Sequence, residues 1–382
     1  EDGIRDIGVT GVQTCALPIS RGLAEALATG ESKSGQFPAK AKHIIYLHMV
    51  GGPSQMDLWD HKPKMQEWYD KDLPESVRNG QRLTTMTSGQ SRFPIAPSKF
   101  RFSQVGSNGL WMNTELLPWT SKVADDLCLI RSMHTEAINH EPAICAMQTG
   151  NQVQGRPCIG SWVSYGLGSL NQNLPAFVAI PDMRGLPPNG PNNWTAGFLP
   201  ATYQGTSFNT ETPIANLNSP KGATPTQEKA LRRFLENLNR SHAEQNPGHS
   251  DLAARVAAYE LAARMQLSAP EVTDISKESE ATRHFYGADS SNPLKAGYAK
   301  NCILTRRLLE RGVRFVQLYC GACASAVDGL LNWDAHKTLK EDYERHVPIL
   351  DQPTAALIKD LKQRGLLADT LILWTKIGRA HV

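Results

Sequence analysis

The sequence lacks the features that would assign it to a specialised class of protein. No apolar run approaches the roughly 18 consecutive residues that a membrane-spanning helix needs. The formal net charge of +3 is too small to indicate binding to nucleic acid or to a membrane surface. We find no internal repeat, no glycine-rich phosphate loop and no GxSxG nucleophile elbow. With 40% hydrophobic and 20% charged residues, we expect an ordinary globular protein with neither a nucleic-acid partner nor a transmembrane segment.

The two ends of the chain read as translated nucleic-acid adapter. Residues 1–19 and 376–382 correspond, codon by codon, to the two strands of a common short-read sequencing adapter. A signal peptide is the alternative interpretation of the first segment, but that segment has no basic start and no continuous apolar core. We therefore exclude both segments from the fold and expect the natural protein to extend beyond residues 20–375 in both directions.

The rest of the chain indicates one α/β domain over residues 43–375, preceded by a flexible approach segment at residues 20–42. Compact apolar runs predict strands at residues 43–49, 127–131, 174–181, 313–319 and 370–374. Helical spacing of apolar residues predicts helices at residues 113–124, 140–149, 159–167, 226–241, 251–267, 297–311 and 353–365. Residues 182–225 predict an irregular surface insertion. The alternation of helix and strand indicates a mostly parallel sheet in a three-layer α/β/α sandwich.

Three helix details follow from the pattern. Leu231, Phe234 and Leu238 recur at helical spacing within residues 226–241. Arg306 and its basic neighbours are expected on the polar side of the helix over residues 297–311. Pro353 is expected to open the last helix, because proline is tolerated in a first turn.

Three polar clusters follow predicted strands, and ligands of open α/β sheets bind beyond the carboxyl ends of the strands. The first cluster offers Asp57 and Asp60 after the Gly51-Gly52 turn. A turn followed by an Asp helix cap explains the same residues. The third cluster offers Asp334 and His336, which can bind a divalent ion from an extended backbone. An Asp at a helix start is again the alternative.

The second cluster, at residues 132–141, is the densest in polar side chains. It contains His134, Thr135, Glu136, Asn139 and His140. A turn from strand to helix at this point would also offer exposed helix N–H groups to an anion. The alternative is a polar loop in which Asn139 caps the following helix.

The pair Cys320 and Cys323 has the spacing of redox and zinc motifs. A single CxxC supplies only two of the four ligands of a structural zinc site, and this pair follows a strand rather than opening a helix. A structural pair of thiols, or one disulfide in an exported protein, is the preferred interpretation.

Taken together, ordered motifs over residues 36–375 resemble domain-of-unknown-function family 1501. This sulfatase-like family of the alkaline-phosphatase superfamily is common in planctomycetes and related bacteria. The matching motifs are FPAKAK at 37–42, GGPSQMDLWDHKP at 51–63, HT at 134–135 with NH at 139–140, GRPCIGSWVSYG at 155–166, GFLP at 197–200, YQG at 203–205, YELA at 259–262, RGVRFVQ at 311–317, WDAH at 333–336 and GLL at 365–367.

The resemblance implies a metal-dependent hydrolase of sulfate or phosphate esters. It implies that Asp57, with Asp60 as the weaker choice, and Asp334 and His336 bind divalent metal of the zinc, calcium or magnesium class. The substrate would be a small-molecule or polysaccharide ester. On this alignment His140 occupies the position of the sulfatase nucleophile, and Thr135 is the substitute candidate. Thr135, Asn139 and His140 are therefore the predicted catalytic residues.

Two departures from the family pattern shape the functional expectation. Neither Ser nor Cys stands at the nucleophile position, so a non-catalytic exported surface or carbohydrate-binding protein is the alternative function. Family members also continue after the last strand with EFGR and GRDH motifs, which this sequence lacks. We therefore expect this chain to be inactive as written. The family usually carries a twin-arginine leader, which implies export to the periplasm or beyond.

Overall fold

The structure, a computed structural model, describes residues 39–377 apart from residues 79, 81–88, 134, 138, 210–221, 223, 247–249, 324–329 and 337. In this part of the chain, five parallel strands form one sheet in the order β5-β4-β6-β1-β7. Their bounds are β1 His43–Met49, β4 Phe177–Ile180, β5 Thr206–Ser207, β6 Phe315–Cys320 and β7 Thr370–Lys376. Strands β2 (Phe102–Val105) and β3 (Leu110–Asn113) form a separate antiparallel pair.

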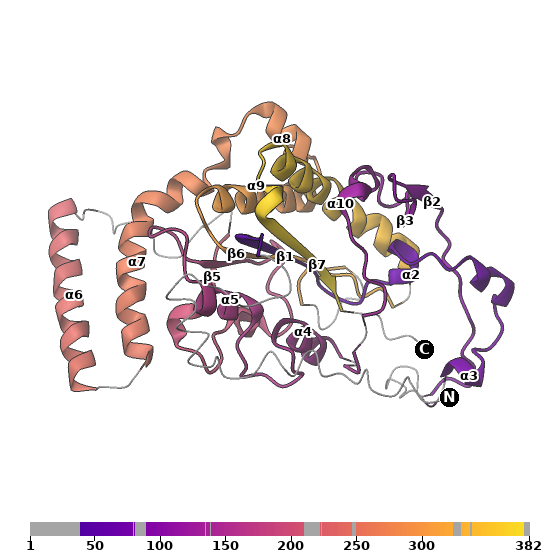
Figure 1. The fold of residues 1–382 in the computed structure, drawn as a ribbon, viewed down its shortest axis with the longest axis horizontal. Helices are drawn as coiled ribbons and strands as arrows, with labels where there is room; N and C mark the ends of the chain where they lie inside the picture. Colours follow the sequence, from indigo (N-terminus) through magenta and orange to yellow (C-terminus); the bar gives the residue numbers. More distant parts are fainter. Residues whose placement is uncertain are drawn as a thin grey trace.

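Helices cover both faces of the sheet, which confirms the predicted three-layer α/β/α sandwich. Figure 1 shows α8 (Glu280–Tyr286), α9 (Pro293–Glu310) and α10 (Leu339–Gln363) on one side of the sheet, and α4 (His140–Thr149) and α5 (Ile159–Leu167) on the other. The remaining helices are α2 Gln55–Leu58, α3 Glu75–Arg78, α6 Pro225–Gln245 and α7 Ser250–Thr273, with 3-10 turns η2 Pro63–Trp68, η3 Thr120–Asp126, η4 Gly190–Trp194, η5 Ala201–Tyr203, η6 Ile275–Lys277 and η7 Leu367–Asp369.

Strand β1 shows how the sequence builds two cores. Successive side chains of a strand point to opposite faces of its sheet. Ile45 and Leu47 therefore enter the larger core, together with residues of α9 and α10. Tyr46 and Val50 enter the smaller core on the other face. Almost every residue of β1 is buried, as expected for the middle of a parallel sheet.

The prediction of a strand at residues 127–131 is wrong. These residues have no strand partner, and Ile130 is 65% exposed, so this apolar run lacks the burial that a strand of this sheet would have. The helix predicted over 113–124 is the 3-10 turn η3, which starts later, at Thr120. The carboxylate of Asp351 accepts hydrogen bonds from the backbone N–H groups of Trp119 and Thr120 (2.9 and 2.7 Å) and so fixes this start.

The last helix also differs from its prediction. Helix α10 begins at Leu339 and contains Pro348 and Pro353 in its interior. Each proline removes one backbone hydrogen bond, but the helix buries a long apolar stripe that includes Tyr343 and Leu357. Tertiary packing therefore outweighs the local preference of proline for a helix start.

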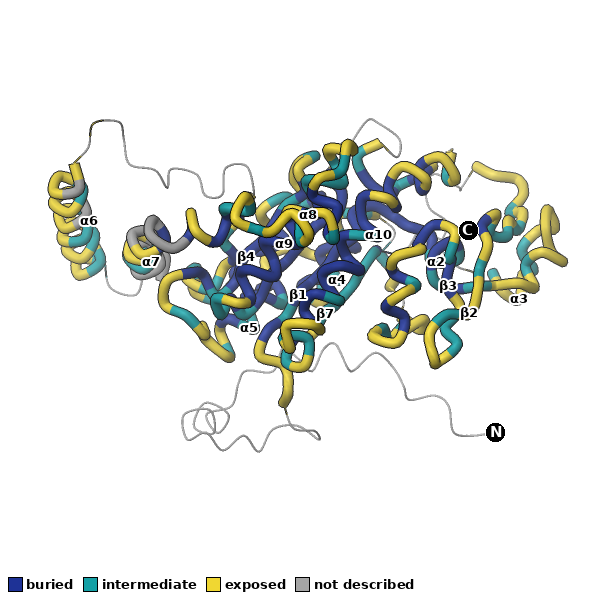
Figure 2. Tube along the Cα trace, turned by 90° about the horizontal axis from the view of Figure 1, so that it is seen from above, coloured by how far each residue is buried: buried dark blue, intermediate teal, exposed yellow. Residues whose placement is uncertain are grey.

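Helices α6 and α7 stand at one end of the molecule, away from the sheet (Figures 1 and 2). The Thr224 hydroxyl and the Gln227 side chain form a capping box at the start of α6. The periodic apolar residues of α6 do not enter the core, because Leu231, Phe234 and Leu238 are each more than half exposed. Among the described residues, no helix has the length and apolarity to cross a bilayer.

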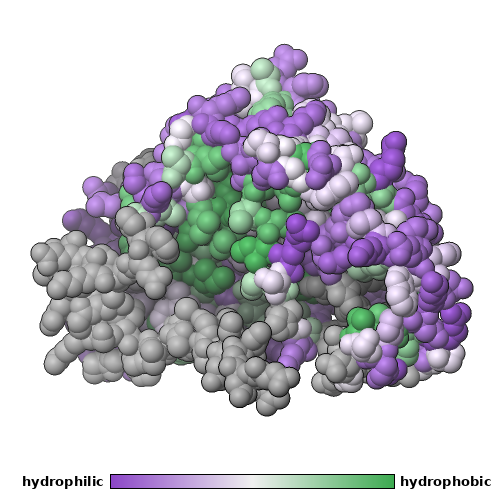
Figure 3. All heavy atoms as spheres, turned by 45° about the vertical axis from the view of Figure 1, so that its right-hand side comes forward, coloured by the Kyte–Doolittle hydropathy of each residue, from purple (hydrophilic) through white to green (hydrophobic). Residues whose placement is uncertain are grey.

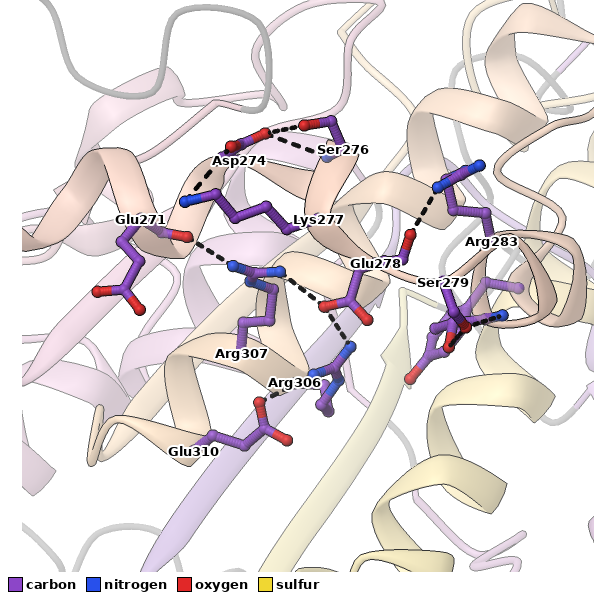
Figure 4. Close-up of polar contacts among 12 residues, drawn as sticks. Glu271, Asp274, Ser276, Lys277, Glu278, Ser279, Arg283, Arg306, Arg307 and Glu310 are labelled. Atoms are coloured by element: carbon purple, nitrogen blue, oxygen red, sulfur yellow. Dashed lines mark hydrogen bonds and ion pairs between the residues drawn. The ribbon is translucent and has the colours of Figure 1, made fainter.

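The arginines of α9 lie on a polar side that is buried rather than solvated. Figure 4 shows Arg306 and Arg307 pointing at Glu278, which precedes α8. Arg306 has a 3% exposed side chain and lies 2.8 Å from both Glu278 and Glu310. Asp360 of α10 lies 3.3 Å from the same guanidinium. These ion pairs join α9 to the segments packed on either side of it.

Candidate functional site

The site lies beyond the carboxyl ends of β1 and β6, where two loops dock on each other. The backbone N–H of Trp333 donates to the carbonyl of Val50 at 2.9 Å, which ties the loop after β6 to the end of β1. Gly51 has a φ of +100°, and a Cβ there would lie 2.7 Å from the backbone nitrogen of Asp334. Only glycine permits both this backbone conformation and this close approach.

Three side chains of the predicted clusters meet at this place. His140, the first residue of α4, has its Nε2 atom 2.7 Å from Oδ2 of Asp334. His336 has its own Nε2 atom 2.7 Å from the same oxygen. The Asn332 side chain accepts from the Asp334 N–H at 2.9 Å and so orients the loop. We call these three residues, His140, Asp334 and His336, the His–Asp–His cluster.

The charges of the cluster stabilise one another. Burial disfavours the charged carboxylate of Asp334, but hydrogen bonds with His140 and His336 outweigh it and lower the pKa of this carboxyl. The hydrogen bond to Asp334 is also the main cause that raises the pKa of His140, and burial opposes it. Both shifts favour the ion pair between a protonated His140 and an ionised Asp334.

The stability contribution of this pair depends on pH in a definite direction. A raised His pKa contributes fully below its unfolded value of about 6.5 and is lost as pH rises through the folded pKa. A lowered Asp pKa contributes above its unfolded value of about 3.9 and is lost as pH falls through the folded pKa. The His140–Asp334 pair therefore stabilises the fold most between about pH 4 and 6.5.

The cluster is open enough to meet a ligand. The side chains of His140, Asp334 and His336 are 36%, 26% and 33% exposed. The Nδ1 atom of His140 is buried and has no hydrogen-bond partner. Two imidazole nitrogens and one carboxylate are a donor set that suits a borderline divalent ion. In the described part of the chain, however, no three His, Cys, Asp or Glu side chains lie in position to hold one as they stand.

Among the described residues, neither aspartate after β1 forms a hydrogen bond or ion pair with the His–Asp–His cluster. Asp57 is 8% exposed, and its carboxylate makes neither hydrogen bond nor ion pair with the described residues. Its backbone carbonyl accepts from the side chain of Asn113 at 2.6 Å. The carboxylate of Asp60 lies 2.9 Å from Lys62 and 3.5 Å from Arg131. Of the two aspartates, Asp57 is therefore the one whose carboxylate has no hydrogen-bond or ion-pair partner among the described residues.

The other predicted catalytic residues, Thr135 and Asn139, form no hydrogen bond with the cluster in the described structure. Thr135 is exposed, and its hydroxyl accepts a 3.3 Å hydrogen bond from the N–H of Ala137. Asn139 precedes α4 in the N-cap position but its side chain caps nothing there. Among the described residues of this segment, His140 is thus the one whose side chain contacts Asp334. His134 lies outside the described residues.

A buried polar cluster behind the site was not predicted from the sequence. Asp182, after β4, accepts hydrogen bonds from Arg184 (2.7 Å twice) and from the N–H of Gly321 (2.8 Å). Arg184 also lies 3.1 Å from Nδ1 of His346, whose ring packs against Trp333. The ion pair with Asp182 raises the pKa of Arg184 despite the opposing effect of burial. These residues fall within and beyond the predicted irregular insertion, and no spacing in the sequence connects them.

A second unpredicted group lies where β1 and β7 end. His48 hydrogen-bonds through Nδ1 to the Thr375 hydroxyl at 3.0 Å, while its buried Nε2 has no partner. Burial lowers the pKa of His48 to about 3. Burial also lowers the pKa of Lys376 to about 8, and its ammonium lies 3.3 Å from the side-chain oxygen of Gln55. Ile377 is buried against Ile144 of α4.

The cysteine pair differs in environment, and the two thiols are not joined by a disulfide in the described structure. Cys320 is buried and Cys323 is exposed, and all six described cysteines are free thiols. Burial raises the pKa of Cys320 to about 12, although the nearby Arg184 acts in the opposite direction. The thiolate is the reactive form, so Cys320 is a poor nucleophile.

The fold and the site define an α/β protein with a parallel sheet and a histidine–carboxylate cluster beyond the carboxyl ends of its strands. The model of a family described as "Protein of unknown function (DUF1501)" matches residues 41–380. The chain therefore belongs to this family. No curated protein and no solved structure matches it.

Proposed function

We propose that this protein binds a divalent metal ion through His140, Asp334 and His336, and that it hydrolyses sulfate or phosphate esters. One observation carries the proposal. The Nε2 atoms of two histidines from separate segments converge on a single oxygen of Asp334, at 2.7 Å each. This donor set lies beyond the carboxyl ends of parallel strands, which is the place where open α/β sheets bind their ligands.

When bound, the ion would supply Lewis acidity toward an ester oxygen. The chain's own residues set the conditions for it. Asp334 holds both imidazoles with Nε2 toward the shared position, and Asn332 orients the backbone of Asp334. His140 must lose its proton before it can bind a metal, since a metal takes only the neutral imidazole. Asp57 is the uncommitted carboxylate nearest in sequence to the end of β1, and its role as a further ligand stays a prediction.

The competing function is a non-catalytic, exported surface or carbohydrate-binding protein of the same family. It is favoured by the position of Thr135, whose hydroxyl contacts Ala137 and not the His–Asp–His cluster. The sulfatase-like assignment, the exported location and the catalytic roles of Thr135 and Asn139 all stay predictions.

Calorimetric titration with zinc, manganese, magnesium and calcium distinguishes these functions. Asp334→Asn and His336→Ala should abolish binding, whereas the exposed His242→Ala should leave it unchanged. Turnover of p-nitrophenyl phosphate or p-nitrophenyl sulfate that is lost in Asp334→Asn supports the hydrolase. Because this chain is expected to be inactive as written, absence of turnover agrees with either function, and polysaccharide binding that survives chelation of the ion supports the non-catalytic alternative. Failure to bind any of the four ions refutes the metal site.

A further inference from the structure

A buried ion pair, Asp182 with Arg184, contacts the loop after β6, which carries Asp334. Charged side chains normally lie at the surface, as do the polar residues that border an apolar hollow in Figure 3. The side chains of Asp182 and Arg184 are only 4% and 3% exposed. Taking two charges out of water costs free energy, so a buried pair is weak evidence for a purely stabilising role. The other contacts of this pair indicate what it holds in place.

The geometry of the pair is bidentate. The Nε and Nη2 atoms of Arg184 donate to different carboxylate oxygens of Asp182, each at 2.7 Å. The backbone N–H of Arg184 donates to the same carboxylate at 2.9 Å. A planar guanidinium matches a carboxylate in this way, whereas the single ammonium of a lysine cannot. The short turn after β4 is therefore rigid, and it fixes the positions of both charged groups.

The carboxylate of Asp182 holds the beginning of the loop. Its Oδ2 atom accepts from the N–H of Gly321 at 2.8 Å, and Gly321 directly follows β6. Gly321 has a φ of +113°, and a Cβ there would lie 3.1 Å from Cβ of Val50 and 3.3 Å from Cα of Asn332. The beginning of the loop is thus packed closely against the end of β1 and against the part of the loop that leads to Asp334.

The guanidinium of Arg184 holds the end of the same loop through His346 of α10. Its Nη1 atom lies 3.1 Å from Nδ1 of His346. A guanidinium can only donate, so Nδ1 of His346 is the acceptor and the imidazole is neutral. The ring of His346 packs against the indole of Trp333, with the ring centroids 5.4 Å apart. Trp333 is 1% exposed and directly precedes Asp334.

We propose that Asp182 and Arg184 are positioning residues for the His–Asp–His cluster, an inference that rests on the metal-binding function proposed above. The pair holds both ends of the loop, through Gly321 at the beginning and through the ring packed on Trp333 at the end. The carboxylate of Asp334 is thereby kept 2.7 Å from the Nε2 atoms of both histidines. Residues that orient metal ligands in this way typically change metal affinity by about 10- to 100-fold when they are replaced.

Hydrogen exchange of the metal-free protein tests whether the pair holds the loop. Arg184→Lys keeps the charge but loses the fork, so peptides containing the amides of Gly321 and Trp333 should exchange roughly three- to tenfold faster in mass spectrometry. Arg307→Lys is the matched control, since Arg307 is also a buried arginine in an ion pair, with an 8% exposed side chain 2.7 Å from Glu278. Among the described residues, Arg307 forms no hydrogen bond or ion pair with the loop, and its replacement should leave the exchange of both peptides unchanged.

His346→Phe separates the two contacts and serves as the second variant if Arg184→Lys does not fold by circular dichroism. Phenylalanine keeps a ring against Trp333 but lacks the nitrogen that accepts from Arg184. Exchange should therefore be faster at Trp333 alone, because Asp182 still holds Gly321. Exchange that is unchanged in both Arg184→Lys and His346→Phe would overturn the proposal.

Zinc titration calorimetry tests the consequence for the site. Arg184→Lys should raise the Kd for zinc by about tenfold or more, and Arg307→Lys should leave it unchanged even where urea unfolding shows a similar loss of stability. Unchanged zinc affinity in Arg184→Lys, or equal weakening in both variants, would overturn the positioning role. An unaltered chain that binds no zinc would refute the metal site itself, and the exchange result would then decide whether the pair holds the loop.

Discussion

Gly51 lets the loop after β1 pack against the backbone of Asp334 in the site. Replacing Gly51 with alanine should lower the stability of the fold through two separate effects. The first effect is the cost of placing a side chain at φ +100°, which is about 1–3 kcal/mol. The second effect is contact, because the new Cβ would lie 2.7 Å from the nitrogen of Asp334 and 2.8 Å from that of Trp333. Both atoms belong to backbone that cannot rotate away. The loop would have to shift, which should weaken or break the hydrogen bond from the Trp333 N–H to the Val50 carbonyl, worth about 0.5–1.5 kcal/mol.

Gly155 provides a matched control. Its φ is +109°, but a Cβ there meets nothing within 4 Å. Gly155→Ala should therefore show only the conformational cost, and Gly51→Ala should be less stable than Gly155→Ala by at least about 1 kcal/mol. Urea unfolding followed by tryptophan fluorescence measures both variants, and zinc titration should show weakened binding only in Gly51→Ala. Equal losses of stability in the two variants would refute the docking of the two loops.

Three further predictions concern charge and thiol chemistry. His140→Ala should lower the free energy of unfolding most between about pH 4 and 6.5, and the loss should shrink at higher pH. Urea unfolding at a series of pH values measures this loss. A loss that does not depend on pH contradicts the ion pair between His140 and Asp334. Arg306→Leu should destabilise the protein by less than the about 3–5 kcal/mol of a fully unpaired buried charge, because Glu278 keeps Arg307 and Asp360 keeps Arg364. The loss should still exceed the about 0–1 kcal/mol expected for the exposed Arg240→Leu in the same assay. Iodoacetamide at neutral pH should modify Cys323 but not Cys320 in the folded protein, and mass spectrometry of rapid Cys320 labelling would contradict its burial.

The sequence predicts the layers of the fold because burial in a parallel sheet leaves a strong local signal. Strands β1 and β6 are mostly apolar runs closed by a nearby glycine, and both lie inside the sheet. The start of α10 could not be predicted, because its two interior prolines are tolerated only through packing against α9 and η3. Arg306 reads as a surface residue until its buried carboxylate partners are known.

The site was partly predictable for a similar reason. Strand ends are visible in the sequence, so Asp334 and His336 could be placed at the carboxyl edge of the sheet before the structure was known. The contact between His140 and Asp334 joins residues 194 positions apart, and no local pattern records such a distance. The same holds for Arg184 and His346, which are 162 positions apart. Thr135 was predicted as a substitute nucleophile because it lies near His140 in the sequence, and closeness in the sequence says nothing of where its side chain points.

The central claim is that the His–Asp–His cluster binds a divalent ion in exchange for protons. Zinc titration calorimetry at pH 6.5, repeated in two buffers of different ionisation enthalpy, tests it most directly. We predict binding that releases protons, because the raised pKa of His140 favours the protonated imidazole at pH 6.5, and we predict loss of that binding in Asp334→Asn. Zinc binding that is unchanged in Asp334→Asn, or that releases no protons, would contradict the claim.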